Sequence, residues 1–139
     1  MTIKPLGEQG FSLIEMLISI TILSIGLFAV ATMQTVAISN TALSNRTMTA
    51  TELASQAMED ILSWDPANAA LNASAANVVY ANGVKVTGGG TFNITYQTTI
   101  NTPAIGTTRI DITVTELFGA SGINRPISPI MITGFRKVV

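Results

Sequence analysis

The chain has 139 residues and a net charge of −1, and only 11% of its residues are charged, about half the share that is usual in water-soluble domains. Nucleic-acid binding requires clustered basic side chains that replace the counterions of the phosphates. This near-neutral chain has no such cluster, so we expect no nucleic-acid partner. The absence of cysteine and histidine removes disulfides, thiolate chemistry, the commonest metal ligand and the commonest general base. We therefore expect no metal, no cofactor and no enzymatic activity.

The first ten residues, MTIKPLGEQG, show no periodicity and contain Lys4, Pro5 and Glu8. Lys4 and the initiator amine place positive charge ahead of the apolar run that follows. Positive charge at this position orients the N-terminal end of a membrane segment toward the cytoplasm.

An apolar run extends from residue 11 to residue 35, and Glu15 is its only charged residue. It contains about the 20 apolar positions that a membrane-spanning helix needs. Hydroxyl residues such as Thr21 and Ser24 are tolerated there, because they can bond to carbonyls one turn earlier. Gly26 weakens a helix but lets another backbone approach closely, as small residues do between membrane helices. The sequence predicts a transmembrane helix over residues 11–35.

The stretch from Val36 to Trp64 contains neither proline nor glycine, and its apolar residues become one-sided. This pattern predicts an amphipathic continuation of the same helix, over residues 36–65, that stops at Pro66 because the residue before a proline disfavours helix. The expected buried stripe is Leu43, Ala50, Ala54, Ala57, Ile61 and Trp64, flanked by Leu53, Met58 and Leu62. The expected solvent face carries Asn45, Arg46, Thr49, Glu52, Gln56, Glu59 and Asp60.

Residues 66–139 predict a small antiparallel β domain. After a loop over residues 66–77, Val78–Val86 is expected to form a hairpin around Asn82-Gly83, a strong short-range hairpin signal. Turns are expected at Gly88–Gly90 and Phe118–Asn124. Strands are expected at Phe92–Ile100, Thr108–Leu117 and Ile127–Phe135, and Pro126 and Pro129 confine the start of the last one to an edge or a bulge. We predict an α+β fold, in which the amphipathic half of the helix covers the apolar face of the sheet.

Three interpretations of the N-terminal segment compete. A secretory signal peptide would be cut at Ala29-Val30-Ala31, but Glu15 adjoins its apolar region and the helical pattern runs through the cut. An uncleaved signal anchor leaves Gly10, Phe11 and Glu15 without a role. The third interpretation is a cut after Gly10 that leaves Phe11 as the new terminus of an intact apolar helix.

The residues GFSLIEMLISITIL, from Gly10 onward, resemble the class III signal of type IV prepilins and type II secretion pseudopilins. In that family a glycine precedes the cut, a phenylalanine usually follows it, and a glutamate stands at the fifth mature position. Gly10, Phe11 and Glu15 match this pattern residue by residue. The residues Ser24-Ile25-Gly26-Leu27 and Gln34 further resemble the PilV-like minor pilins.

The resemblance implies that a prepilin peptidase removes residues 1–10 and methylates the amine of Phe11. The protein would then wait in the inner membrane, with its C-terminal domain in the periplasm. It would then enter a fibre at the cell surface. Its partners would be the pilus assembly platform and other major and minor pilins. Residues expected to pack helices together in the fibre are Leu13, Ile14, Leu17 and Gly26.

Two departures from the family pattern favour a minor pilin over a major one. The leader has one lysine and the acidic Glu8, and the lack of cysteine excludes the C-terminal disulfide loop of many major pilins. We therefore expect a minor pilin that helps initiate or modify pilus assembly. The alternatives are a minor pseudopilin of a type II secretion system and a membrane-anchored periplasmic binding domain.

Glu15 also has a physical argument of its own. A carboxylate in an apolar helix costs up to about 3 kcal/mol at the middle of a bilayer, and such residues are usually functional and paired. The amine of Phe11 lies one helical turn earlier, where the helix dipole disfavours positive charge. When helices bundle, the carboxylate of one subunit can neutralise the amine of the next and so set subunit register. The alternative is a carboxylate that snorkels to lipid headgroups.

Overall fold

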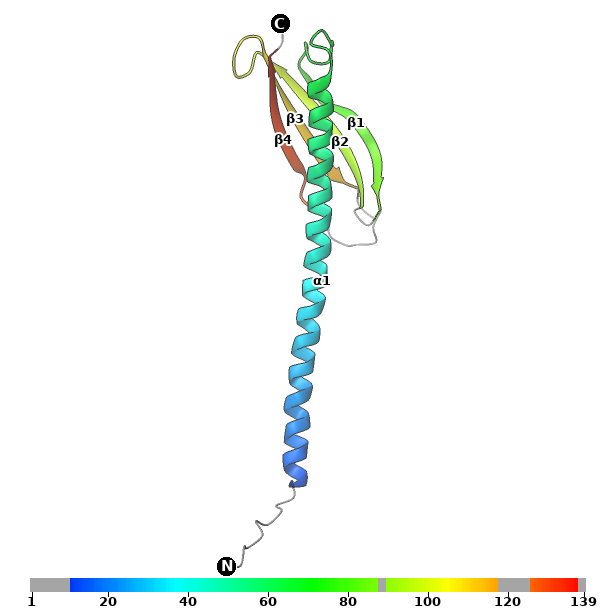
Figure 1. The fold of residues 1–139 in the computed structure, drawn as a ribbon, viewed down its shortest axis with the longest axis vertical. Helices are drawn as coiled ribbons and strands as arrows, with labels where there is room; N and C mark the ends of the chain where they lie inside the picture. Colours follow the sequence, from blue (N-terminus) through cyan, green and yellow to red (C-terminus); the bar gives the residue numbers. More distant parts are fainter. Residues whose placement is uncertain (1–10, 88–89, 118–125, 138–139) are drawn as a thin grey trace, which may run out of the picture. The chain divides into compact units, whose positions relative to one another are not determined.

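The computed structural model describes residues 11–87, 90–117 and 126–137. They form α1 (Leu13–Ser63), β1 (Ala75–Val86), β2 (Gly90–Ile100), β3 (Thr107–Glu116) and β4 (Ile130–Lys137) (Figure 1). The chain divides into two compact units, Met1–Asn40 and Thr41–Val139, and we call the second unit the head. The predicted α+β fold, with one long helix and an antiparallel sheet, is confirmed.

The C-terminal end of α1 is held by contacts from the sheet. Arg136 donates hydrogen bonds from Nη1 to the carbonyl oxygens of Leu62 at 2.6 Å and Ile61 at 3.4 Å. Carbonyls in the last turn of a helix lack intrahelical partners, so the guanidinium satisfies two of them and places its positive charge at the negative end of the helix dipole. Asp65 then accepts a bond from the amide of Ala67 at 2.8 Å, which starts the loop.

The four strands form one antiparallel sheet in the order β1-β2-β3-β4. The β2–β3 pairing runs from Phe92–Glu116 to Ile100–Thr108, and the β3–β4 pairing follows the same regular antiparallel register. The β1–β2 pairing contains three register shifts. Among the described strands, β1 and β4 are therefore the edges, and only β1 is irregular.

The hairpin predicted at Asn82-Gly83 is wrong. Residues 75–86 form the single strand β1, which pairs with β2 on both sides of this dipeptide, at Ala81–Ile94 and Val84–Phe92. Gly83 has φ 66°, and its amide donates to Oδ1 of Asn93 at 2.9 Å. The left-handed glycine is used for a bulge in an edge strand instead of a two-residue turn. The chain reverses later, between the paired Val86 and Gly90.

The strand boundaries differ from the predicted ones by three residues at two other places, and by one or two residues elsewhere. β1 begins at Ala75, inside the predicted loop, and β4 begins at Ile130 rather than Ile127. Pro129 lacks an amide hydrogen and so cannot donate to the ladder, which explains the later start of β4. β4 is an edge strand, as the prolines indicated. The turn predicted at Phe118–Asn124 lies outside the described residues, as do residues 88–89 of the glycine turn.

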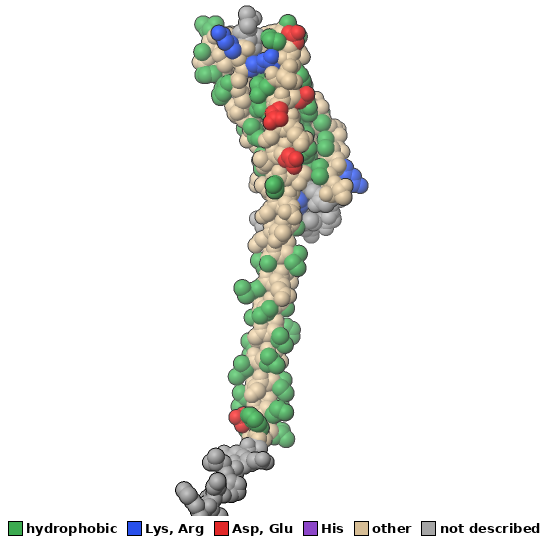
Figure 2. Space-filling model, viewed as in Figure 1, with side chains coloured by type: hydrophobic (Ala, Val, Ile, Leu, Met, Phe, Trp, Pro, Cys, Tyr) green, Lys and Arg blue, Asp and Glu red, His purple; other side chains and the backbone are tan. Residues whose placement is uncertain are grey.

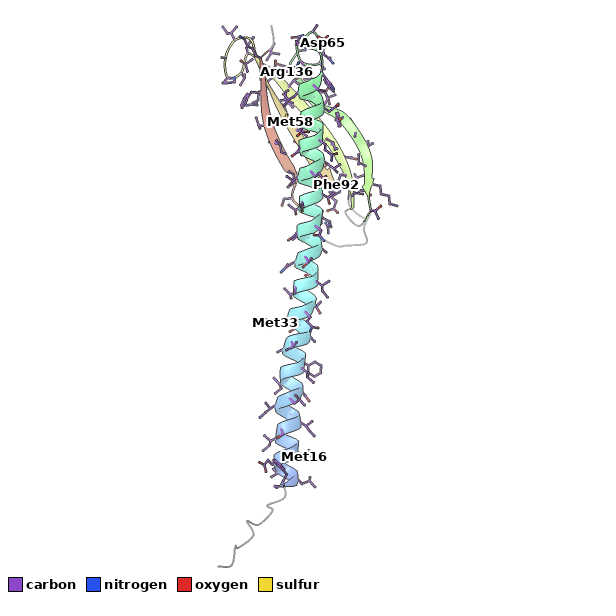
Figure 3. All side chains as sticks on the ribbon, in the orientation of Figure 1. Met16, Met33, Met58, Asp65, Phe92 and Arg136 are labelled. Carbon is purple, nitrogen blue, oxygen red and sulfur yellow. The ribbon has the colours of Figure 1, made fainter. Side chains whose placement is uncertain are left out.

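The head has one hydrophobic core between α1 and the sheet. In Figure 3, the labelled Met58 and Phe92 lie where α1 crosses the sheet. Alternate residues of β2 and β3 point toward the helix, as their sequence pattern predicted. The buried apolar residues of these three elements are Ala50, Ala54, Ala57, Met58, Ile61, Phe92, Ile94, Tyr96, Ile110, Ile112 and Val114.

Small residues at this contact let the helix lie close to the sheet. The alanines of the buried stripe are at most 1% exposed. On β4, a Cβ added to Gly134 would stand 2.6 Å from Sδ of Met58, so the methionine occupies the space above this glycine. The predicted buried stripe is confirmed, with Leu43, Leu53, Leu62 and Trp64 packed partly buried at its margin.

One residue of the predicted solvent face is buried instead. Arg46 is 4% exposed and forms an ion pair with Glu116 at the end of β3, bonding through Nε at 2.9 Å and through Nη2. Glu116 also accepts the amide of Ile127 at 3.0 Å. Because Arg46 lies three residues after Leu43 and four before Ala50, its position belongs to the buried stripe. The sequence pattern assigned Arg46 to the solvent face because arginine is charged.

Candidate functional site

The first turn of α1 fixes the positions of Phe11 and Glu15. The carbonyl of Ser12 accepts the amides of Glu15 at 3.0 Å and Met16 at 3.2 Å, so the helix begins directly after Phe11 and Ser12. Phe11 stands ahead of the helix and is 81% exposed. Glu15 lies in the first turn, where the positive end of the helix dipole favours an acidic side chain.

The first part of α1 is apolar on all sides, and none of its residues is buried. Its most apolar 18-residue window has a mean hydropathy of 2.3, and none of that window is buried. Met16 and Met33 project outward from the helix (Figure 3) and are 60% and 72% exposed. By length and composition α1 can cross a membrane, which fits a single membrane anchor.

Two hydroxyls of this section are satisfied by carbonyls of the helix itself. Thr21 donates to the carbonyl of Leu17 at 2.8 Å, and Ser24 donates to that of Ile20 at 2.7 Å. These bonds confirm the predicted role of the two hydroxyls, and they remove the cost of placing an unpaired hydroxyl in an apolar environment. The hydroxyls therefore do not oppose insertion into a bilayer.

The carboxylate of Glu15 differs from these hydroxyls. Across residues 11–87, 90–117 and 126–137 the structure contains no ion pair that involves its carboxylate, whereas Glu116 in the head is paired. A Cβ added to Gly26 would meet no side chain within 4 Å, so packing within the described chain does not require a glycine there. Contacts among the described residues therefore explain neither the carboxylate nor the glycine of this helix.

The predicted site residues therefore lie as follows. Gly10 falls outside the described residues. Phe11, Leu13, Ile14 and Leu17 are exposed at 55% or more, and the start of the helix brings Phe11 and Glu15 within about one turn of each other. Their roles in cleavage, methylation, register and packing stay predictions.

The head contains a polar cluster that the sequence did not reveal. Asp60 on α1 accepts bonds at Oδ2 from the Tyr80 hydroxyl at 2.9 Å and from Nε1 of Trp64 at 3.3 Å. The hydrogen bond to Asp60, with lesser effects of burial and of the Asp60 charge, raises the pKa of Tyr80 above 10.0. The ring of Trp64 meets Tyr96 edge-to-face at 5.8 Å. These contacts tie the end of α1 to β1 and β2.

In the part of the chain that the structure describes, no group of three or more acidic side chains could hold a metal ion. Glu59, Asp60 and Asp65 therefore do not converge, and Asp60 is engaged with Tyr80 and Trp64. The separation of Asp60 and Tyr80 by 20 residues, on different elements, left no local signal for sequence reasoning.

Comparison with known proteins gives a match at the N-terminal segment. The family model described as the prokaryotic N-terminal methylation motif matches residues 6–31, the stretch that contains Gly10, Phe11, Glu15 and Gly26. No curated protein and no solved structure matches the chain. The motif implies processing by a prepilin peptidase and assembly with pilin or pseudopilin partners.

The matched motif leads into an apolar helix that can anchor the protein in a membrane, and a four-stranded antiparallel sheet packs on the later part of that helix. This is the arrangement of a pilin-like subunit. Residues 6–31 therefore carry the methylation motif of type IV prepilins, which supports a pilin-like or pseudopilin protein.

Proposed function

We propose that the protein is a minor type IV pilin of the PilV-like kind, a structural, non-enzymatic subunit that helps initiate or modify pilus assembly. The observation that carries the proposal is the apolar section of α1, which is exposed on all sides, carries Glu15 as its single charge and overlaps the methylation motif at residues 6–31. An exposed apolar surface of this size requires a bilayer or neighbouring helices around it.

Processing is assigned to the junction of Gly10 and Phe11. A prepilin peptidase removes residues 1–10 as a leader and methylates the new amine of Phe11. The start of α1 at Leu13 supports this assignment, because the cut falls ahead of the helix and leaves the anchor intact. The mature chain then consists of a membrane or fibre-core helix (11–35), its amphipathic continuation (36–65) and a β head (66–139).

Assembly is assigned to Glu15 and to the apolar surface that follows it. In the membrane, and then in the fibre, the Glu15 carboxylate neutralises the amine of Phe11 in the neighbouring subunit, which sets subunit register. The lack of an ion pair for Glu15 within the described residues supports this role, because a carboxylate in an apolar environment needs a partner. Leu13, Ile14, Leu17 and Gly26 supply packing surface, and Gly26 admits a close backbone approach.

The location follows from the same segment. The subunit first spans the inner membrane once, with its head in the periplasm, and later stands in a fibre at the cell surface. Its partners are the prepilin peptidase, the pilus assembly platform, and other major and minor pilins. The absence of cysteine supports a minor role, since the disulfide loop common in major pilins cannot form.

A minor pseudopilin of a type II secretion system is the second candidate, because the matched motif is common to both classes. The test is to delete the gene and to express the chain with an epitope tag in its place. A minor pilin is expected in sheared surface fibres, and its deletion lowers fibre number while secretion is unchanged. Normal fibres together with lost protein secretion would establish the pseudopilin instead.

A further inference from the structure

The bulge in β1 places an asparagine directly before a glycine at the surface of the head. Asn82 and Gly83 are both exposed. They lie between the paired Ala81 and Val84, so these two residues stand opposite Asn93 alone. β1 forms one edge of the sheet (Figure 1), and this edge stands at the surface in Figure 2. Water therefore reaches the junction of Asn82 and Gly83.

An asparagine that precedes a glycine can lose its side-chain amide without an enzyme. The backbone nitrogen of Gly83 would attack Cγ of Asn82 and lose its proton, and the new N–Cγ bond closes a five-membered succinimide ring. The Cγ–Nδ2 bond breaks, and Nδ2 leaves as ammonia after taking up a proton. Water then opens the ring at Cγ, which gives aspartate, or at the backbone carbonyl carbon, which gives isoaspartate. Glycine suits this reaction because it has no Cβ to hinder the approach of its nitrogen, and the chain contains the Asn-Gly dipeptide once.

A side chain of the neighbouring strand holds the attacking nitrogen. The amide of Gly83 donates to Oδ1 of Asn93 at 2.9 Å. The nitrogen must lose its proton and leave the plane of its peptide bond before it can bond to Cγ. The hydrogen bond opposes both changes, because it fixes the direction of the N–H group and because a neutral amide oxygen is too weak a base to remove the proton. Asn93 therefore restrains the reaction in the folded head.

We propose that Asn82 is a site of spontaneous deamidation, and that Asn93 sets its rate by holding the Gly83 amide. The only co-reactant is water. The product places a negative charge in β1, where Lys85 is otherwise the one charged residue. Isoaspartate also routes the backbone through the side-chain carbons and so lengthens it at the bulge, where the ladder is already interrupted. The proposal concerns the head alone and does not depend on the proposed function.

Asn77 provides an internal comparison within the same strand. It is exposed and, like Gly83, has a positive φ, of 54°. The residue that follows it is Val78, whose branched side chain hinders the approach of its backbone nitrogen. The full-length protein in detergent is kept at mildly alkaline pH, and peptide mass spectrometry follows the replacement of amide by carboxylate at each asparagine. Conversion at Asn82 should be about tenfold or more faster than at Asn77.

Removing the acceptor tests the role of Asn93. Asn93→Ala should raise the rate at Asn82 about fivefold, the factor that corresponds to the loss of one typical hydrogen bond. Asn93→Asp keeps an acceptor oxygen and should react at no more than about twice the rate of the unchanged protein. In urea, which unfolds the head and breaks the bond, Asn93→Ala and the unchanged protein should react at equal rates.

A second variant separates the hydrogen bond from a general loosening of the sheet. Thr115 pairs with Asn93 on the other side of β2, and its hydroxyl donates to the Asn93 carbonyl at 3.5 Å. Thr115→Ala therefore removes a contact of the same residue but leaves the Asn93 side chain in place. The rate at Asn82 should stay within about twofold of the unchanged protein, because the Gly83 amide keeps its acceptor.

Three results would overturn the proposal. Conversion at Asn82 no faster than at Asn77 would remove Asn82 as the modification site. Equal rates in folded Asn93→Ala and the unchanged protein, or an Asn93→Asp variant as fast as Asn93→Ala, would remove the restraint by the acceptor. Acceleration by Thr115→Ala, or the full effect of Asn93→Ala persisting in urea, would assign the change to something other than this hydrogen bond. None of these results bears on the N-terminus of the mature protein, so the proposed function keeps its own test.

Discussion

The two sections of α1 use similar apolar residues in opposite ways. Ile25, in the first unit, is 65% exposed, whereas Ile61, in the head, is fully buried. Residue type therefore does not decide burial. In the head, polar residues alternate with the apolar stripe and the sheet covers it, whereas the first section is apolar on every side. The head contains the partner of its apolar surface, and the first section must find its partner in a bilayer or in neighbouring subunits.

The largest expected effect comes from removing the single charge of the apolar section. Glu15→Ala should still be processed but should enter sheared fibres at least tenfold less, because the neighbouring amine loses its partner. The ratio of tagged protein in fibres to that in membranes measures this. Ser19→Ala, one turn further along the same helix, is the control and should enter normally. Normal incorporation of Glu15→Ala would refute the register role.

The buried ion pair of the head gives the next largest effect. Glu116→Ala should lower the free energy of unfolding by about 4 kcal/mol, because it leaves the buried Arg46 guanidinium without this carboxylate. Asp111→Ala, which breaks the more exposed pair with Arg109, should cost less than about 1 kcal/mol. Denaturant unfolding of the full-length protein in detergent, followed by the fluorescence of Trp64, measures both. Equal costs would mean that burial does not distinguish the pairs.

One isoleucine in each section tests the comparison directly. Ile61→Ala should destabilise the head by about 3 kcal/mol, through lost apolar transfer and the cavity left between helix and sheet. Ile25→Ala, with the same chemical change on the exposed section, should alter head stability by less than about 0.5 kcal/mol. The same fluorescence measurement applies. A comparable loss in both variants would show that the two sections unfold as one.

Tyr80 provides the smallest effect and a pH signature. Its pKa is raised above 10.0, so its contribution to stability is fully present below about pH 10 and disappears as the pH rises through the higher pKa of the folded state. Tyr80→Phe should cost less than about 1 kcal/mol at neutral pH, and its difference from the unchanged protein should vanish in strong alkali. Absorbance titration checks the pKa, and titration of Tyr80 at or below pH 10 would contradict it.

Sequence reasoning found the elements whose signals are periodic. The alternation in β2 and β3 and the alanine stripe of α1 follow from the repeat of each element and its single buried face. The class III signal could be found from the sequence because the spacing and type of its residues define it. The family motif that matches residues 6–31 covers the same stretch. These features need no knowledge of distant contacts.

The errors arose where distant contacts decide the outcome. Asn82-Gly83 became a bulge because β2 extends alongside it, and Gly83 bonds to Asn93. Arg46 was assigned to solvent because its partner, Glu116, lies 70 residues away. Asp60 and Tyr80 meet across two elements for the same reason. Local sequence shows the propensity of each segment but not the residues that tertiary packing brings to it.

The N-terminus of the mature protein tests the central claim most directly. Mass spectrometry of the chain from membranes and fibres should find a methylated Phe11 as the first residue, with residues 1–10 absent. In the Gly10→Val variant, the full-length chain should remain uncut. A terminus at Thr32, or an intact leader on the unchanged protein, would contradict the account.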